Sequence, residues 1–179
     1  MVVRPQNFEE VALPHLQAAY NLARWLTRND KDAEDVVQEA YLRAYKHFGT
    51  FCANDARPWL LAIVRNTYHT WIRRNRFAHI EITLEDETFK HPQSVDDPEM
   101  LLLKEVDKQM LRGALRRLPT EFLEVIVLRE FEQMSYKQIS EVVEIPLGTV
   151  MSRLARARKR LAELVGNCHS KTTPAELVV

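Results

Sequence analysis

The chain has 179 residues, enough for one ordinary domain or two small ones. The chain has 25 basic and 25 acidic residues. Hydrophobic residues make up 46% of the sequence and charged residues 28%, a composition that argues against wholesale disorder. The longest apolar run, Trp59–Val64, is too short for a transmembrane helix, and the N-terminus lacks the apolar core of a signal peptide. The two cysteines, Cys52 and Cys168, argue against a disulfide framework or a cysteine-based zinc site and fit a reducing cytoplasm.

The balanced total charge conceals three blocks. Residues 1–78 hold 11 basic and 8 acidic residues, residues 79–111 hold 3 and 9, and residues 112–179 hold 11 and 8. Within the acidic block, residues 79–100 have no helical period and contain Pro92 and Pro98, and a loop of roughly 20 residues is unusual inside one compact domain. With only 4 glycines and few β-branched runs, the chain is predicted to be all-α, with two small helical domains joined by an acidic flexible linker.

In the first domain, apolar residues at helical spacing predict helices over 8–28, 32–48 and 56–76. Pro14 should bend or delay the first helix, and Asn54 or Asp55 can cap the third. The second helix has one apolar stripe, and its other side carries Asp32, Asp35, Glu39, Arg43 and Lys46, with Gln38 and Leu42 beside them.

That polar face has three possible interpretations. Three carboxylates on one helical face suit a hard cation, but basic residues share the face and no histidine accompanies it, so we predict no metal and no other cofactor. A solvated face with internal salt bridges is the simplest alternative. A docking surface for a partner is the third, favoured by an exposed Leu42 beside a dense polar patch.

The third helix mixes aromatic residues, among them Trp59, Tyr68 and Trp71, with a basic end at Arg73, Arg74 and Arg76. The aromatic residues could simply form the core. Alternatively, aromatic rings can stack on unpaired bases while arginines neutralise phosphates, which would make this helix a nucleic-acid surface.

In the second domain, the pattern predicts helices over 100–118, 120–132, 136–143 and 147–165, with a frayed tail over 167–179. Ser135 and Gln138 have the spacing of a capping box. In the last helix we expect one buried stripe, formed by Leu147, Val150, Leu154, Ala157, Leu161 and Leu164. A short helix, a tight turn and a longer helix with a Ser/Thr/Arg face is the arrangement that enters a DNA major groove. A basic solvated helix is the alternative.

Two segments resemble bacterial sigma factors of the sigma-70 family. DAEDVVQEAYLRAY (32–45) is similar to their second region, and the segment from Leu118 to Leu161 is similar to their fourth region. Their order, the acidic linker and the short length resemble the extracytoplasmic-function (ECF) group. The resemblance implies a region 2 bundle over 1–78, a linker over 79–99 and a region 4 helix-turn-helix over 100–166.

The resemblance also implies roles for individual residues. Region 2 would dock on the clamp of the largest subunit of core RNA polymerase, through Asp35, Gln38, Glu39 and Leu42. It would read and melt the −10 element as single-stranded DNA, through Phe48, Phe51, Asn54, Arg57, Trp59, Arg65, Asn66, Arg73 and Arg74. Region 4, near the polymerase flap, would read the duplex −35 element through Thr149, Ser152, Arg153, Arg156, Lys159 and Arg160.

The expected function is promoter-specific initiation of transcription in the cytoplasm, with no catalysis and no small-molecule substrate. An anti-sigma factor, often membrane-anchored in this family, is the expected inhibitor. Two other classes compete with this interpretation. A stand-alone helix-turn-helix regulator would explain 118–165 and would bind DNA as a dimer. A metal-dependent nuclease would use Asp32, Asp35 and Glu39 and would bind metal tightly.

Overall fold

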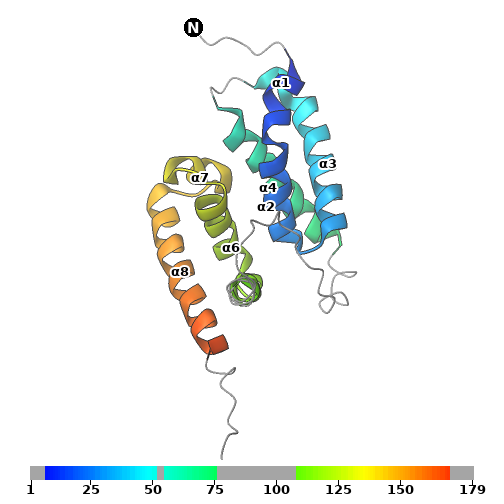
Figure 1. The fold of residues 1–179 in the computed structure, drawn as a ribbon. Coiled ribbons are helices and arrows are strands. Elements are labelled where there is room, and N and C mark those ends of the chain that lie inside the picture. Colours follow the sequence, from blue (N-terminus) through cyan, green and yellow to red (C-terminus); the bar gives the residue numbers. More distant parts are fainter. Residues whose placement is uncertain (1–6, 52–54, 76–107, 170–179) are drawn as a thin grey trace, which may run out of the picture.

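A computed structural model describes residues 7–51, 55–75 and 108–169, and these ranges are helical with no strand among them. An N-terminal bundle lies beside a C-terminal unit that ends in the long helix α8 (Figure 1). This architecture confirms the all-α prediction. The linker 79–99, the tail from residue 170, Cys52 and Asn54 lie outside the described residues.

The N-terminal bundle contains α1 (Phe8–Ala12), η1 (Leu13–His15), α2 (Leu16–Thr27), α3 (Asp30–His47), η2 (Phe48–Thr50) and α4 (Ala56–Arg74). Pro14 replaces one helical turn with the 3-10 turn η1, as its missing N–H requires. Arg28 ends α2 in the left-handed conformation with φ 61°. Asn29 then caps α3, its side chain accepting from the Asp32 N–H, so α3 begins two residues earlier than predicted.

Helix α4 closes the bundle against α2 and α3. Of the two predicted caps, Asp55 is the one observed, accepting from the Arg57 N–H at 3.0 Å. The helix ends at Arg74, two residues before the predicted end. Leu60, Leu61 and Val64 are fully buried and pack the core of the bundle.

The C-terminal unit departs from prediction where one helix was expected over 120–132. Helix α6 (Thr120–Ile126) passes instead into the π-helical turn η3 (Val127–Phe131), in which the Glu132 N–H donates to the Val127 carbonyl five residues earlier, at 3.1 Å. Gln133 follows with φ 52°. Before α6, residues 108–116 are helical.

Helices α7 (Tyr136–Val143) and α8 (Leu147–His169) form the predicted helix-turn-helix. The predicted capping box is present, since Ser135 Oγ accepts from the Gln138 N–H at 3.2 Å and Gln138 Oε1 accepts from the Ser135 N–H at 2.9 Å. Helix α8 begins after Pro146, whose carbonyl accepts from Thr149 and Val150. It extends past the predicted end at residue 165.

The buried stripe of α8 is confirmed at Val150, Leu154, Ala157 and Leu164, and Leu161 packs against the core while partly buried. The prediction is wrong at Leu147, which is 48% exposed. Leu147 is the first residue of α8, so no preceding helical turn covers it, and the turn after α7 leaves it at the surface.

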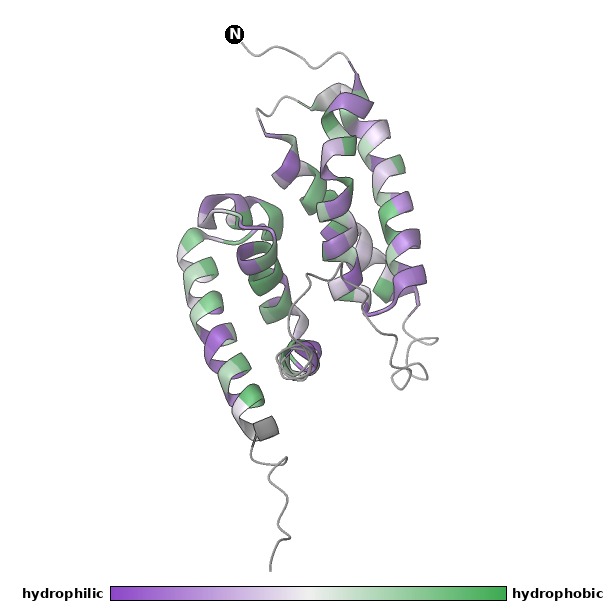
Figure 2. Ribbon diagram, viewed as in Figure 1, coloured by the Kyte–Doolittle hydropathy of each residue, from purple (hydrophilic) through white to green (hydrophobic). Residues whose placement is uncertain are grey.

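The two units pack on each other. Buried apolar residues of both belong to one continuous core, with α2 against α6 and α4 against α7 (Figure 1). The hydropathy colouring shows α6 apolar over most of its length, whereas α3 and α8 alternate between polar and apolar residues (Figure 2). The sequence does not predict this packing. Within the described residues, no helix is both long enough and apolar enough to span a membrane.

Replacing Ser135 by alanine should lower the free energy of unfolding by about 1 kcal/mol, because one end of the capping box loses its acceptor. Urea unfolding monitored by circular dichroism measures this loss. Ser135→Thr keeps a hydroxyl acceptor and should retain most of the stability. Equal stability of the alanine variant and the wild type would show that the box contributes nothing.

Candidate nucleic-acid and polymerase interfaces

Helix α8 presents the polar face expected to enter a major groove. Its apolar stripe packs against α6 and α7, which leaves the opposite face to solvent. Exposed there are Ser152, Arg156, Lys159 and Arg160, while Thr149 and Arg153 are half-buried at its edge. Arg156 Nε donates to the Ser152 carbonyl at 3.2 Å, so its guanidinium lies along the helix toward the N-terminus.

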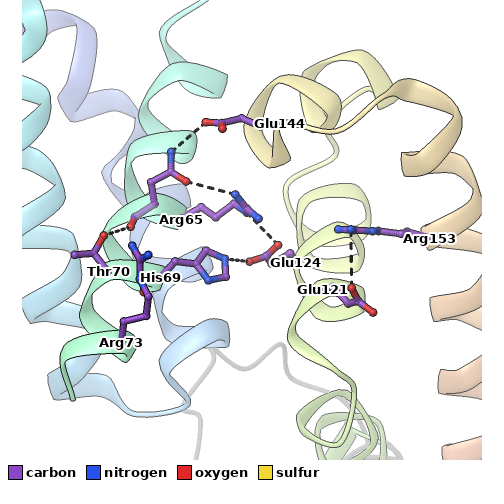
Figure 3. A network of polar contacts seen from close by, with 9 residues as sticks. Arg65, His69, Thr70, Arg73, Glu121, Glu124, Glu144 and Arg153 are labelled. Atoms are coloured by element: carbon purple, nitrogen blue, oxygen red, sulfur yellow. Dashed lines mark hydrogen bonds and ion pairs between the residues drawn. The ribbon is translucent and has the colours of Figure 1, made fainter. Parts of the chain in front are cut away.

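Two of these arginines already have acidic neighbours. Arg153 NH2 lies 3.9 Å from Glu121 Oε2 on α6, a loose pair that holds the side chain against the edge of the unit (Figure 3). Arg160 pairs with Glu163 at 3.1 Å on the same helix. Exposed pairs of this kind are worth about 0–1 kcal/mol, so phosphates or base edges can replace them.

The predicted docking face on α3 is solvent-exposed. Asp35, Gln38, Glu39 and Leu42 are exposed on one side of the helix, and Leu42 is 53% exposed. Glu39 Oε1 accepts from Arg43 Nε at 2.8 Å, so part of the face has the internal pairing of the solvated alternative. A salt bridge between exposed residues costs little to break, so this pair is compatible with docking.

A groove of about 410 Å³ runs beside this face between α2 and α3. It is lined by Leu16, Gln17, Tyr20, Glu34, Val37, Gln38 and Tyr41. The Tyr41 hydroxyl donates to the Ala12 carbonyl at 2.9 Å, and burial raises its pKa to about 12, so the phenol is neutral at physiological pH. Gln38 belongs both to the groove and to the predicted docking face.

The predicted −10 aromatic residues form a cluster with Phe8. Phe48 packs edge-on against Phe8, with ring centroids 5.4 Å apart, and stacks on Phe51 at 6.1 Å. Phe51 is only 7% exposed and lies 4.6 Å from the Trp59 ring, which is half-buried. The rings therefore contribute to packing, as the core alternative expects. Asn54, the other predicted residue of this loop, lies outside the described residues.

The basic residues of α4 point in two directions. Arg73 and Arg74, at the end of the helix, are exposed, and Arg73 Nε donates to the His69 carbonyl at 3.1 Å. The other predicted −10 residues, Arg57, Arg65 and Asn66, instead reach across to the C-terminal unit. The residues of α4 that the sequence analysis assigned together to −10 recognition therefore lie in two different environments.

One carboxylate of α6 receives two partners from α4. Arg65 Nε donates to Glu124 Oε2 at 3.0 Å, and His69 Nε2 lies 2.6 Å from Glu124 Oε1 (Figure 3). Glu124 is only 1% exposed. Nearby, Asn66 Nδ2 donates to Glu144 Oε1 at 3.1 Å, at the left-handed C-terminal cap of α7.

A second buried carboxylate, Glu132, makes a similar contact after the π-helical turn. Its Oε2 accepts from Arg57 NH2 at 2.5 Å and its Oε1 from Asn21 Nδ2 at 3.2 Å. Glu132 is 4% exposed. Gln138 Nε2 also donates to Asp55 Oδ2 at 2.8 Å, and the rings of Trp25 and Phe131 lie 5.1 Å apart beside them.

Sequence reasoning missed these glutamates. A usable signal existed at Glu124, which sits between Leu123 and Val125 inside an apolar run. A carboxylate in an apolar run predicts a basic partner elsewhere in the chain, because burying an unpaired charge is costly. Glu144 also has apolar neighbours, Val143 and Ile145, whereas Glu132 stands beside Gln133 near Glu130 and carries a weaker signal. The described residues contain no group of three or more potential metal ligands.

Comparisons with known proteins show the family to which the chain belongs. The family described as Sigma-70 region 2 matches residues 12–78, and the family described as Sigma-70, region 4 matches residues 108–161. The chain is 32% identical over 174 residues to the ECF RNA polymerase sigma-E factor of Haemophilus influenzae, covering 90% of this chain and 91% of that protein. The chain belongs to the ECF sigma factors. Sigma factors direct RNA polymerase to promoters and are not enzymes.

Other sigma factors have a similar sequence identity to this chain. The RNA polymerase sigma-H factor of Pseudomonas aeruginosa is 31% identical over 161 residues, which covers 86% of this chain and 83% of that protein. The ECF RNA polymerase sigma factor SigE of Mycolicibacterium smegmatis is 30% identical over 93% of this chain, and the chain spans 64% of its length.

Two solved structures resemble the fold. The sigma factor RpoE of Bartonella quintana, in complex with the anti-sigma factor NepR, has a TM-score of 0.70 and 27% identity, covering 90% of this chain and 98% of that one. CnrH, in complex with the cytosolic domain of CnrY, has a TM-score of 0.61 and 26% identity, covering 89% and 88%.

Arg153→Ala should weaken binding of this sigma factor to its −35 duplex by about 1–3 kcal/mol, roughly 5- to 150-fold, if the guanidinium reads a base. Fluorescence anisotropy at fixed salt measures this. Arg158→Ala is the matched control, because this substitution removes the same charge from α8 at a position that lies beside Glu130 of η3, 2.7 Å away, and is not among the residues predicted to read DNA. Equal losses of DNA affinity in both variants would show that the effect comes from the lost positive charge and not from a contact between Arg153 and a base.

Proposed function

We propose that this ECF sigma factor binds core RNA polymerase through α3 and recognises a two-part promoter, with region 2 on the −10 strand and region 4 on the −35 duplex. The observation that carries the proposal is the pairing of matches to regions 2 and 4, in that order, with an exposed polar face on each. Region 2 here means residues 12–78 and region 4 residues 108–161.

Support for −35 recognition comes from the face of α8. Its exposed arginines and lysine lie opposite the buried stripe of Val150, Leu154, Ala157 and Leu164, so they can enter a major groove without disturbing the core. Arg156 offers a fork-shaped donor that suits guanine edges. Lys159 and Arg160, farther along the helix, suit phosphates.

Support for −10 recognition comes from the donors of α4. Arg57, Arg65 and Asn66 hydrogen-bond carboxylates in this structure, and the same N–H groups can serve phosphate oxygens or base edges. Arg73 and Arg74 extend the basic surface at the exposed end of the helix. Binding the unpaired strand would lower the free energy of the melted promoter, so recognition would itself favour strand opening.

Support for polymerase docking comes from the exposure of Asp35, Gln38, Glu39 and Leu42 on one side of α3. A partly charged face with an exposed leucine at its edge suits a basic helical partner such as the polymerase clamp. Docking would fix the distance between the two DNA-reading regions, which a linker alone leaves undetermined. The two contacts then reinforce each other through effective concentration.

An anti-sigma factor is the proposed inhibitor, and the factor would act in the cytoplasm, where polymerase works. The similarity to RpoE, whose solved structure holds the anti-sigma factor NepR, supports this. Membrane anchoring of the inhibitor is the family expectation.

The test is run-off transcription with purified bacterial core polymerase on genomic fragments that include the upstream region of the gene. Discrete transcripts that require the chain are expected. Binding of duplex DNA as a dimer without transcription would favour the stand-alone regulator. Tight metal binding with DNA cleavage would favour the nuclease and overturn the proposal.

Reversing two charges on the docking face, with Asp35→Arg and Glu39→Arg together, should abolish co-purification with core polymerase while leaving the helical content unchanged. Both carboxylates are exposed, so reversal removes attraction without disturbing the core. Glu9→Arg with Glu10→Arg makes the same charge change at exposed positions of the neighbouring helix α1, outside the four docking residues, and should bind normally. Normal co-purification of the α3 variant would remove this face from the interface.

A further inference from the structure

Helix α8 carries a second set of apolar residues that does not pack against the core. Leu147 is 48% exposed and Met151 is 52% exposed, and Ala155 is exposed one turn further on. Among the residues that the structure describes, none of the three belongs to the buried core or to the partly buried residues packed against it. Because they are four positions apart on an α-helix, the three side chains follow one another along one side of α8 and form an apolar row.

The packing of α8 does not depend on the apolar row. Val150, Leu154, Ala157 and Leu164 already hold the helix against α6 and α7. Exposed apolar residues scattered singly need no explanation, whereas apolar side chains aligned at successive turns present one surface to a partner.

Gly148 lies in the first turn of α8, beside the apolar row, and is exposed. A Cβ atom at this position would meet nothing within 4 Å, and the residue does not have a positive φ. Neither packing nor backbone conformation within the described chain therefore requires a glycine here, although glycine forms helices poorly. A glycine of this kind suits a place where another molecule approaches the backbone closely.

The exposed face of α8 has small residues in its middle and larger ones on its flanks. At about 100° per residue, Gly148, Ser152 and Ala155 lie opposite the buried stripe, with Met151 on one flank and Arg156 on the other. The small residues allow the helix to approach the floor of a major groove, which is about 12 Å wide and admits one α-helix. In that position Met151 and Arg156 face base edges on either side of the groove. The apolar row is thus continuous with the surface proposed to read the −35 element.

The chemistry of Met151 favours one base. The apolar groups that a major groove offers are the C5-methyl groups of thymine. A methionine side chain is unbranched and flexible, so it can close around a methyl group. It has no N–H or O–H to donate and its thioether is a weak acceptor, so polar base edges beside it would lose hydrogen bonds to water without replacement.

We propose that Met151, flanked by Leu147 and Ala155, reads a thymine methyl group in the −35 element. The inference rests on the proposed function, because it takes α8 as the −35 reader. Met151 and Arg156 are five residues apart, about 7.5 Å along the helix, so the thymine should lie within about three base pairs of the base that Arg156 contacts.

The first test removes the methyl group and nothing else. Each thymine of the −35 element, on both strands, is replaced in turn by deoxyuridine in a promoter found by run-off transcription. Binding of the holoenzyme formed from core polymerase and the full-length factor is then measured. At one position the replacement should weaken binding of the wild type about fourfold, the effect of losing one buried methyl group.

Three variants show whether this loss comes from Met151. Met151→Gln keeps the length of the side chain but makes it polar, so thymine and deoxyuridine should bind equally. Met151→Leu stays apolar and should keep the preference for the methyl group. Leu111→Ala is the matched control, because it truncates another exposed apolar residue of region 4, 42% exposed, and should behave like the wild type.

A second test uses Gly148→Ala. The free chain should be at least as resistant to thermal unfolding as the wild type, because alanine forms helices better and its Cβ meets no other atom of the chain. Promoter binding should nevertheless weaken by about fivefold or more, the effect of a steric conflict in a packed contact. Unchanged promoter affinity would place the base edges away from this face and overturn the proposal.

The outcomes separate this proposal from the proposed function. Equal binding of every deoxyuridine promoter and the thymine promoter, or the same loss in Met151→Gln, overturns the methyl contact even if run-off transcription succeeds. Loss of core polymerase binding in Met151→Gln with an unchanged methyl preference would assign the apolar row to a protein partner and also overturn it.

If run-off transcription fails, the same replacements are made in a duplex that the free chain selects from a random pool. A methyl preference that requires Met151 would then support the contact although the proposed function has failed. A chain that selects no duplex overturns both.

Discussion

Two carboxylates with almost no solvent around them determine how the two halves of the chain meet. A buried, ionised glutamate costs several kcal/mol unless cationic or hydrogen-bonding groups surround it. Glu124 obtains Arg65 and His69, and Glu132 obtains Arg57 and Asn21, all from the N-terminal bundle. Because these side-chain partners all come from region 2 in the part of the chain that the structure describes, the burial of both glutamates depends on region 2. The shared apolar core follows from this alignment of α4 with α6 and α7.

The charged residues on the solvent-facing sides of α3 and α8 interact more weakly than the buried glutamates do. On α3 and α8 most of the charged residues are exposed, and their ion pairs join residues of the same helix or unit. Such pairs are worth little in water and break readily when a partner brings its own charges. The chain thus keeps its strongly coupled charges inside the contact between its halves and its weakly coupled charges on the faces proposed to bind polymerase and DNA.

Local patterns in the sequence predicted the elements well. Helix α7 has its predicted bounds because its capping box and apolar spacing lie within a few residues of each other. The exposure of Asp35, Gln38, Glu39 and Leu42 follows directly from the 100° spacing of α3 once its apolar stripe is assigned. Asn29 displaced the start of α3 because a side-chain acceptor in extended backbone starts a helix earlier than the apolar pattern implies.

Long-range features could not be predicted in the same way. Arg57 and Glu132 lie 75 residues apart, and either could have paired with many other charged residues of the chain. Leu147 fits the apolar period of α8 but lies at its first turn, where the period does not determine burial. The π-helical turn has no local signature in VLREF, since its wider ring depends on how the following residues pack.

The π-helical turn η3 determines how this part of the chain tolerates the deletion of a residue. A π-helical turn holds one residue more than an α-helical turn, so η3 advances the chain by one position before Glu132. Deleting a single residue within 127–131 could leave an unbroken α-helix and so be tolerated by the local backbone. Because the wide turn absorbs the extra residue without turning the chain that follows, this deletion would leave Glu132 facing nearly the same direction relative to α6. The same deletion within the regular α-helical part of α6 would instead rotate everything that follows by about 100°, so the π-helical turn is where this helix can lose a residue without reorienting Glu132.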